Sequence, residues 1–562
     1  MRLKKVSLYA PSFKPEQWSP RDRKYLTPFA TNIDGLVHVL HSIPPEIVGA
    51  LCSRASRAKE SLLRVFLNEY IYPIVDGDDK ALAKELNRVV DFLTEHGFKN
   101  ILNNQRAQGF YIKWLSLYGD DSIAQNTGAH IVYWGISQVA MKFIEDQRIG
   151  LEPIEKSTRY VNFGKKVSGR YLYYTPIPDL RRMNLLTEYT KALDGLFDTY
   201  NILVPQFVEW LKHKYDEKEG VLEKKAFDTL RGLLPMATVG QVAFRGNAAA
   251  YEYLINRLRA HELGEFRWLA ETSKEELDTE IPSLLLRTED EKSRHYQEYL
   301  AHCARDTERE LPKRLQSELS LYESVSKPEV HLVEYDKHAT EHVIAGILYS
   351  LPGTHRSWND ITLLVRKMGI EQKKEILDSF FRERKERWYK PGRALENADV
   401  RFEILMDIGA YRDLHRHRML TQDRQTFTIY HKYSVSPEII EAGMERPYRK
   451  ALDSIVPLFK KLESESTLLA QYIVPLAYRI RFYQKQNLAS LFWETELRTG
   501  SQGHPDYRHI EQEKYRLFAK KAPLLAQFMR IDMNEYPLAR RGESERTAAK
   551  ESFLQKKLTH KK

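Results

Sequence analysis

The stretches RGLLPMATVGQVAFRGN (231–247) and QYIVPLAYRIRFYQKQN (471–487) share one spacing pattern. In each, a short apolar turn ends at a proline, Pro235 or Pro475, and an asparagine, Asn247 or Asn487, follows twelve residues later. We interpret each stretch as a helix–turn–helix segment. Equal spacing over such a length indicates that the chain contains two diverged copies of one sequence unit.

Two further pairs of segments support this duplication. Residues 36–56 and 329–350 each predict a short alternating strand followed by an amphipathic helix, and residues 129–150 and 400–420 each pass from period-two alternation to helical spacing. Long helical patterns dominate, so we expect an α+β fold. The predicted boundaries are 1–325 for the first copy, 326–539 for the second copy and 540–562 for a basic, flexible tail.

Composition excludes several classes of protein. The 562 residues contain 87 Lys and Arg against 77 Asp and Glu, a small excess that argues against a dedicated nucleic-acid binder and suits small anionic substrates. Cys52 and Cys303 are the only cysteines, which excludes a disulfide-rich secreted protein and a cluster of thiolate metal ligands. We find no secretory signal, no apolar run of membrane-spanning length and no glycine-rich nucleotide loop of the Rossmann or P-loop type. The expected location is cytoplasmic.

The densest group of polar residues is Asp413-Leu-His415-Arg416-His417-Arg418. Cationic side chains at the end of a helix suit its C-terminal dipole, so a helix cap with a basic surface is one interpretation. The other is a clamp for an anion and a cofactor, because guanidinium groups bind phosphate with paired hydrogen bonds and an imidazole can contact a planar ring.

A second group is Glu155, Ser157 and Arg159, which we place on an extended segment whose alternate side chains point the same way. Together Ser157 and Arg159 could hold one phosphate, or the segment could be a plain polar edge. Arg231 and Arg498 stand in apolar surroundings and need a partner. A bound nucleotide and a buried carboxylate, such as Glu494 or Glu496, are the two candidates.

Taken together, an Arg-His-Arg at a helix end, a Glu-x-Ser-x-Arg, an Arg-x-x-x-Pro and an Asn followed by Leu-Arg resemble the flavin-dependent thymidylate synthases, ThyX. The resemblance covers most of both copies, so the chain is similar to a tandem, fused form of that family. It implies two ThyX-like halves that form a pseudo-dimer, each mostly helical with a small antiparallel sheet. Because the family is tetrameric, we expect a homodimer of this chain.

The resemblance also implies a reaction. It predicts an enzyme that converts dUMP to dTMP with FAD as cofactor and with methylenetetrahydrofolate and NADPH as co-substrates, without a metal. The first copy keeps four residues that match substrate-binding positions of the family, namely Glu155, Ser157, Arg159 and Arg231. Its Arg-His-Arg has become Asp146-Gln147-Arg148, and Leu258 stands at the position of the Leu-Arg arginine.

The second copy shows the reciprocal losses. It keeps residues that match flavin-binding positions, Arg416, His417, Arg418 and Asn487, of which Arg416 also matches a dUMP contact, and it keeps Arg498, which matches the catalytic arginine that acts on the uracil ring. Thr426-Phe-Thr428 replaces the Ser-x-Arg, and Gln471 replaces Arg231. Asp413 and Trp493 depart from a glutamine and an asparagine of the family pattern.

Each copy therefore retains what the other has lost, which predicts one complete composite site for dUMP and FAD between the two halves. Two alternatives stay open. The departures at Asp413, Trp493 and Thr428 favour a related flavin enzyme acting on another pyrimidine nucleotide. The loss of family motif residues from each copy favours a homologue that binds nucleotide or flavin without catalysing a reaction.

Overall fold

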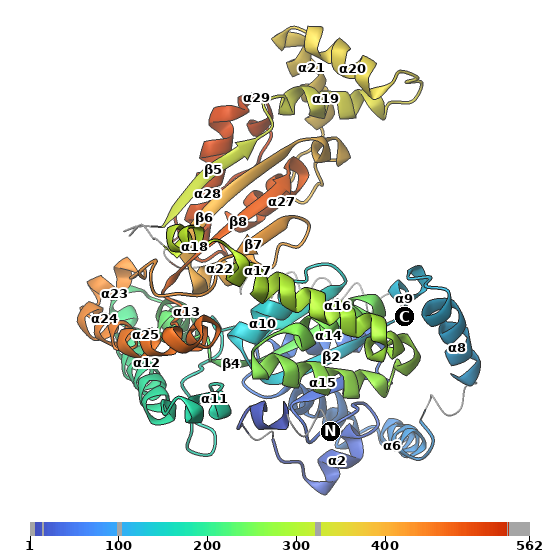
Figure 1. The fold of residues 1–562 in the computed structure, drawn as a ribbon, viewed down its shortest axis with the longest axis vertical. Helices are drawn as coiled ribbons and strands as arrows, with labels where there is room; N and C mark the ends of the chain where they lie inside the picture. The colour runs from blue at the N-terminus through green and yellow to red at the C-terminus, as the bar shows by residue number, and fades with distance from the viewer. Residues whose placement is uncertain (1–5, 14–15, 98–103, 321–327, 537, 539–562) are drawn as a thin grey trace. The chain divides into compact units, whose positions relative to one another are not determined.

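The computed structural model describes residues 6–13, 16–97, 104–320, 328–536 and 538 of the chain (Figure 1). Contacts between Cα atoms divide the chain into two compact units. Unit 1 comprises Met1–Ser324, Thr428–Tyr430 and Val435–Leu476, and unit 2 comprises Val325–Phe427, His431–Ser434 and Ala477–Lys562. The units do not coincide with the two sequence copies, since Val435–Leu476 of the second copy groups with unit 1. The predicted boundary at 325 and the tail 540–562 lie outside the described residues.

Unit 1 contains a four-stranded antiparallel sheet (Figure 1). Its strands are β1 (Val37–Leu40), β2 (Gly128–Ser137), β3 (Leu151–Glu155) and β4 (Val239–Asn247), in the spatial order β1-β2-β4-β3. Three helices accompany it, namely α10 (Gln138–Glu145), α14 (Ala248–Ala260) and α15 (Gly264–Asp278). Tyr133 on β2 reaches α15, where its hydroxyl lies 2.8 Å from the Ser273 hydroxyl. The helices therefore supply the buried face of this sheet.

The sheet of unit 2 repeats this arrangement. Its strands are β5 (Glu329–Tyr335), β6 (Asp399–Asp407), β7 (Thr421–Arg424) and β8 (Arg479–Asn487), in the spatial order β5-β6-β8-β7. The corresponding helices are α22 (Ile408–Leu414), α27 (Leu488–Arg498) and α28 (Pro505–Lys521). Both the duplication and the α+β class are confirmed.

The residues after the two prolines form strands, so the predicted helix–turn–helix is wrong. Arg231–Leu233 and Gln471–Ile473 are single 3₁₀ turns, η4 and η9, and β4 and β8 follow them. In β8, arginine, tyrosine and lysine alternate with the buried residues Ile480, Phe482, Gln484 and Gln486, which is the period of a half-buried strand. The equal spacing between proline and asparagine therefore predicted the repeat correctly, but the helical secondary structure predicted for it is wrong.

The two matched asparagines are helix N-caps. The Oδ1 of Asn247 accepts the backbone N–H of Ala250 at 2.8 Å, and the Oδ1 of Asn487 accepts that of Ser490 at 2.9 Å. An N-cap side chain satisfies one of the backbone donors that a helix leaves unpaired at its start. The equal spacing therefore reflects the same structure in both copies: a strand of equal length followed directly by a helix that an asparagine caps.

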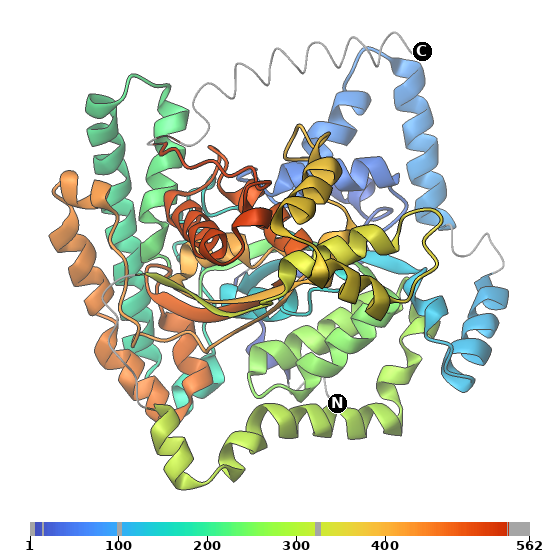
Figure 2. The ribbon, with the colours of Figure 1, turned by 90° about the horizontal axis from the view of Figure 1, so that it is seen from above.

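Helices from both copies pack together within unit 1. The helices α12 (Leu186–Lys214) and α13 (Glu219–Leu230) form a helical hairpin. In both views α12 lies beside α24 (Glu445–Asp453) and α25 (Val456–Glu465) (Figures 1 and 2). Further helices of unit 1 include α2 (Pro20–Leu26), α3 (Pro45–Ala55), α6 (Lys80–Glu95), α8 (Asn104–Tyr111), α16 (Glu291–Ala301) and α18 (Lys313–Ser320). In unit 2, α19 (Ala339–Tyr349), α20 (Trp358–Lys367) and α21 (Ile370–Phe381) form a small helical group.

Backbone hydrogen bonds in unit 1 join the two proline turns symmetrically. The Met236 N–H donates to the Val474 carbonyl at 2.9 Å, and the Leu476 N–H donates to the Leu234 carbonyl at 2.9 Å. These residues are exchanged by the 240-residue offset between the copies. The contact is therefore of the self-complementary kind found on a two-fold axis between identical partners.

None of the helices in the described ranges is long and apolar enough to cross a membrane.

Candidate functional site

The predicted site residues of the first copy lie in unit 1, and Arg416, His417, Arg418, Asn487 and Arg498 of the second copy lie in unit 2. In unit 1, two of the predicted phosphate ligands converge on one carboxylate. A guanidinium nitrogen of Arg159 lies 3.0 Å from Asp228 Oδ2, and Arg231 Nε lies 3.5 Å from Asp228 Oδ1. Asp228 is in the last turn of α13, and Arg231 begins η4 directly after it. All three side chains are largely buried, so water and salt screen the attraction between Asp228 and the two arginines only weakly.

Glu155 has an internal partner that the sequence analysis did not name. Its Oε2 lies 3.3 Å from Nζ of Lys142, whose side chain on α10 is fully buried between Glu155 and Glu145. The carboxylate is therefore engaged in a buried ion pair at the end of β3.

The prediction of an extended segment through Ser157 and Arg159 is wrong, because β3 ends at Glu155 and a turn follows. The Ser157 hydroxyl accepts the backbone N–H of Arg159 at 3.2 Å, a local bond that favours a turn over continued strand pairing. Ser157 and Arg159 are thus brought together by this turn and not by strand alternation.

Backbone bonds fix which residues of the second copy correspond to this turn. The Lys156 N–H donates to the Gln241 carbonyl, and the Gln425 N–H donates to the Arg481 carbonyl. Both acceptors stand six residues before a capping asparagine. Thr426 and Thr428 therefore occupy the positions of Ser157 and Arg159, and the second copy has no guanidinium there.

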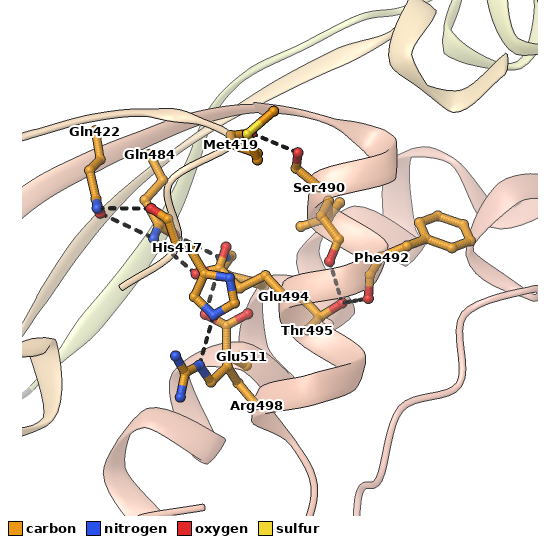
Figure 3. A network of polar contacts seen from close by, with 12 residues as sticks. His417, Met419, Gln422, Gln484, Ser490, Phe492, Glu494, Thr495, Arg498 and Glu511 are labelled. Atoms are coloured by element: carbon orange, nitrogen blue, oxygen red, sulfur yellow. Dashed lines mark hydrogen bonds and ion pairs between the residues drawn. The ribbon is translucent and has the colours of Figure 1, made fainter. Parts of the chain in front are cut away.

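The cluster of unit 2 is built on the turn after α22 and on α27. The helix α22 ends at Leu414; in the turn that follows, Arg416 is exposed, and His417 and Arg418 are half-buried. The Nε–H of Arg498, the last residue of α27, donates to His417 Nε2 at 2.7 Å (Figure 3). The structure thus brings His417 and Arg498, which are 81 residues apart, into direct contact.

This hydrogen bond determines the protonation state of the imidazole. A guanidinium cannot act as an acceptor, so His417 Nε2 must carry a lone pair and the ring proton must sit on Nδ1. Burial lowers the pKa of His417 to about 3, with Glu494 opposing and Arg498 reinforcing the shift. His417 is therefore neutral at physiological pH and presents Nδ1–H as a donor.

Arg498 is not neutralised by a carboxylate among the described residues. Glu496 forms two hydrogen bonds, of 2.9 and 2.6 Å, with the guanidinium of Arg384, and Glu494 lies 2.9 Å from Nζ of Lys514. The guanidinium carbon of Arg498 lies 5.6 Å from the centroid of the Tyr507 ring. The hypothesis that Glu494 or Glu496 pairs with Arg498 is therefore wrong.

A family model described as "Thymidylate synthase complementing protein", Thy1, matches residues 79–283 and 331–524. The chain belongs to the Thy1 family. The two matched regions confirm the tandem arrangement of two ThyX-like halves, which the resemblance to the flavin-dependent thymidylate synthases implied.

Curated relatives span almost the same length. A UPF0159 protein of Chlamydia pneumoniae is 36% identical over 538 residues, which cover 94% of this chain and 97% of the relative. One from Chlamydia muridarum is 34% identical, covering 95% and 99%, and one from Thermoplasma acidophilum is 29% identical, covering 78% and 91%. The solved structure of a UMP/dUMP methylase from Streptomyces cacaoi, bound with 5-Br dUMP, is 16% identical with a TM-score of 0.30, covering 37% of this chain and 96% of that one, a likeness too small to support an inference.

Within this Thy1 protein, Asn487 has a structural task in addition to its predicted contact with flavin. Its Oδ1 is engaged in capping α27, so the amide nitrogen is the group left for a cofactor. The sequence analysis named Glu494 of α27 as a buried carboxylate but missed the two buried ionisable residues of α28 that lie close to it, Glu511 and Lys514. No local pattern reveals them, because charged residues also line the exposed face of α28.

Proposed function

We propose that this protein is a flavin-dependent thymidylate synthase that methylates dUMP to dTMP with methylenetetrahydrofolate, FAD and NADPH. The observation that carries the proposal is the pairing of a neutral His417 with an Arg498 that no described carboxylate neutralises, in a chain of the Thy1 family.

Arg498 would stabilise charge on the substrate. Its guanidinium is cationic at any working pH, so it cannot act as a base. Placed beside the pyrimidine, it would favour the negative charge that develops on the ring when C5 attacks the one-carbon donor. The hydrogen bond to His417 fixes the direction of the guanidinium and leaves its terminal nitrogens for the ring.

Ser157, Arg159 and Arg231 would bind the phosphate of the nucleotide. Asp228 already holds both guanidiniums close together, so the two cations are preorganised for a phosphate. The phosphate would compete with the Asp228 carboxylate for hydrogen bonds from both guanidiniums. These residues contribute affinity and orientation, and no bond changes at them.

The residues of unit 2 fit FAD as cofactor. Arg416 and Arg418 are cationic beside a neutral imidazole whose Nδ1–H can donate to a ring, and an anionic, planar cofactor calls for such groups. FAD would supply the hydride that completes the methyl group. Arg416, His417, Arg418 and the amide nitrogen of Asn487 would hold and orient it.

We infer from the complementary losses that a single bound nucleotide uses residues of both copies. The first copy has Gln147 and Leu258 where the second has His417 and Arg498, and the second has Thr428 where the first has Arg159. The prediction is one dUMP bound per chain in calorimetry. Two equivalent dUMP molecules per chain would contradict it.

The direct test is turnover by the full chain. Purified protein should show the absorbance of oxidised flavin and should form dTMP from dUMP only when both methylenetetrahydrofolate and NADPH are present. If the protein binds dUMP tightly with all components present and leaves it unmethylated, the proposal is lost.

A related enzyme for another pyrimidine nucleotide is the second candidate. Trp493 replaces the flavin-contacting asparagine and exposes 43% of its surface, and Asp413 is buried where the family has glutamine. Exchange of deuterium at C5, measured with dUMP, UMP and dCMP in parallel, distinguishes the two candidates by the nucleotide that exchanges.

A further inference from the structure

Three ionisable side chains lie fully buried close to His417 and Arg498 in unit 2. Lys514 Nζ is 2.9 Å from Glu494 Oε2 and 3.0 Å from Glu511 Oε1, and each of the three side chains has no exposed surface. None of the three is explained by the chemistry proposed above.

Hydrogen bonds connect this cluster to the turn that carries His417 (Figure 3). Lys514 donates to Gln484 Oε1 at 2.9 Å, and the Gln484 amide donates to Glu494 at 3.0 Å and faces Gln422 Oε1 at 3.5 Å. The Gln422 amide donates to the backbone carbonyls of His415 and His417, at 2.9 and 3.3 Å. On the other side, Glu494 stands one helical turn before Arg498 on α27. The cluster is thus tied to both partners of the His417–Arg498 bond.

The charges of the cluster are balanced. Burial would raise the pKa of Glu494, but Lys514 and the hydrogen bonds from Lys514 and Gln484 hold it below its usual value. Burial raises the pKa of Glu511 to about 8 against the opposing effect of Lys514. Near pH 7 the cluster therefore contains one ammonium, one carboxylate and one protonated carboxyl group.

Stability alone does not account for such a cluster, because replacing a buried ion pair with well-packed apolar residues is often neutral or stabilising. The first copy is apolar at three positions of the network. Counted from the capping asparagines, Phe244 stands for Gln484, Leu254 for Glu494 and Leu258 for Arg498. Pro153 pairs with Phe244 in the register where Gln422 pairs with Gln484. All of these residues are apolar, and Leu254 and Leu258 are buried.

The first copy also lacks the histidine. Gln147 stands at the position of His417, and its amide donates to the Ala250 carbonyl. The polar residues at the positions of Gln422, Gln484 and Glu494 and the His–Arg pair are therefore present together in one copy and absent together from the other, on the same sheet topology.

We propose that Gln422, Gln484, Glu494 and Lys514 form a positioning network. The network keeps the side chains of His417 and Arg498 in the relative orientation that the reaction requires. This rests on the function proposed above. None of the four side chains contacts the nucleotide or cofactor in this proposal. The network acts by fixing the turn after α22 through Gln422 and the helix α27 through Glu494.

The experiment compares three variants of the full-length holoprotein. Glu494→Gln removes the carboxylate nearest to Lys514 and leaves Glu511 as its carboxyl partner. The double variant Glu494→Leu/Lys514→Met removes both charges and reproduces the apolar side chain of the first copy at one of the two positions. Glu513→Gln, on the exposed face of α28, is the matched control. Each is measured for thermal unfolding, for kcat and KM, and for the ¹⁵N shifts of the His417 ring, assigned by comparison with His417→Gln.

We expect Glu494→Gln to lower both the unfolding temperature and kcat. The double variant should recover the unfolding temperature and still lose about 10²-fold in kcat, the scale of an ångström-sized misplacement, with little change in KM. Its His417 Nε2 shift should move away from that of a hydrogen-bond acceptor, while Glu513→Gln should match the wild type.

Recovery of wild-type kcat together with stability, or an unchanged His417 spectrum in the double variant, would overturn the positioning role. If the wild type makes no dTMP, the proposed function fails by itself, and the His417 spectra still decide whether the network holds the pair.

Discussion

Arg498→Ala is the substitution with the sharpest expected effect on the proposed reaction. No described carboxylate neutralises the guanidinium, so its full charge is available to the pyrimidine. A unit charge at about 4 Å from the developing charge contributes about 4 kcal/mol at an effective dielectric constant of about 20. Loss of one such donor in other enzymes costs about 10²–10³-fold in kcat.

The expected result is therefore a fall of about 10²–10³-fold in kcat, with a smaller change in KM for dUMP, because the charge acts mainly in the transition state. Arg498→Lys keeps the charge and loses the planar Nε–H that bonds to His417, so it should recover part of the rate. The assay is the initial rate of dTMP formation at saturating co-substrates.

Arg516→Ala is the control, because Arg516 is an exposed arginine on the neighbouring helix α28 whose ion-pair partner among the described residues is Glu513. If Arg498→Ala keeps kcat within about threefold of the wild type and raises only KM, the transition-state role is refuted, since uniform binding alone would then be lost.

Three further predictions concern other parts of the chain. Arg159→Ala should raise KM for dUMP about 10- to 100-fold with a smaller change in kcat, since a hydrogen bond to a charged group contributes about 1.5–3 kcal/mol, whereas the exposed Arg170→Ala should change neither. Asn247→Ala and Asn487→Ala should each lower unfolding free energy by about 1 kcal/mol through loss of an N-cap, and only Asn487→Ala should also weaken flavin retention in absorbance measurements. Burial raises the pKa of Glu265 to about 7, so the stability that its protonated form contributes is complete below pH 4.5 and is lost as the pH rises through about 7. Glu265→Gln should flatten this loss when unfolding temperatures at pH 5 and pH 8 are compared, and an unchanged pH profile would contradict the assignment.

The repeat and the class of fold could be predicted from local patterns. The strands at 37–40 and 329–335 and the helices after them lie where alternation and apolar spacing predicted them. The helical prediction for the stretch after Pro475 is wrong, because equal spacing identifies the copies but does not distinguish the strand β8 from a helix. A short apolar segment is ambiguous between the two until its hydrogen-bond partners are known.

The candidate site was predicted only as a set of residues. Chemistry and motif order selected Arg159, Arg231, His417 and Arg498, but not Asp228, which lies against the first two. Nothing adjacent in the sequence distinguishes Asp228 from the other acidic residues around it. Its role follows from two separate parts of the fold: Arg231 begins η4 directly after α13, and Arg159 lies in the turn after β3, so that both guanidiniums reach one carboxylate.

The amino-acid sequence by itself determined the duplication, the strands at 37–40 and 329–335 with the helices after them, and which motifs each copy keeps, because each of these depends on residues that are close together in the chain. Only the tertiary structure decided that His417 is neutral against Arg498, that Lys514 and Glu494 are paired in the interior, and that residues 435–476 pack with the first copy's helices. Burial removes water from an ionisable group, and this determines both which residue it pairs with and whether it is protonated. Burial in turn depends on residues that are distant in the chain.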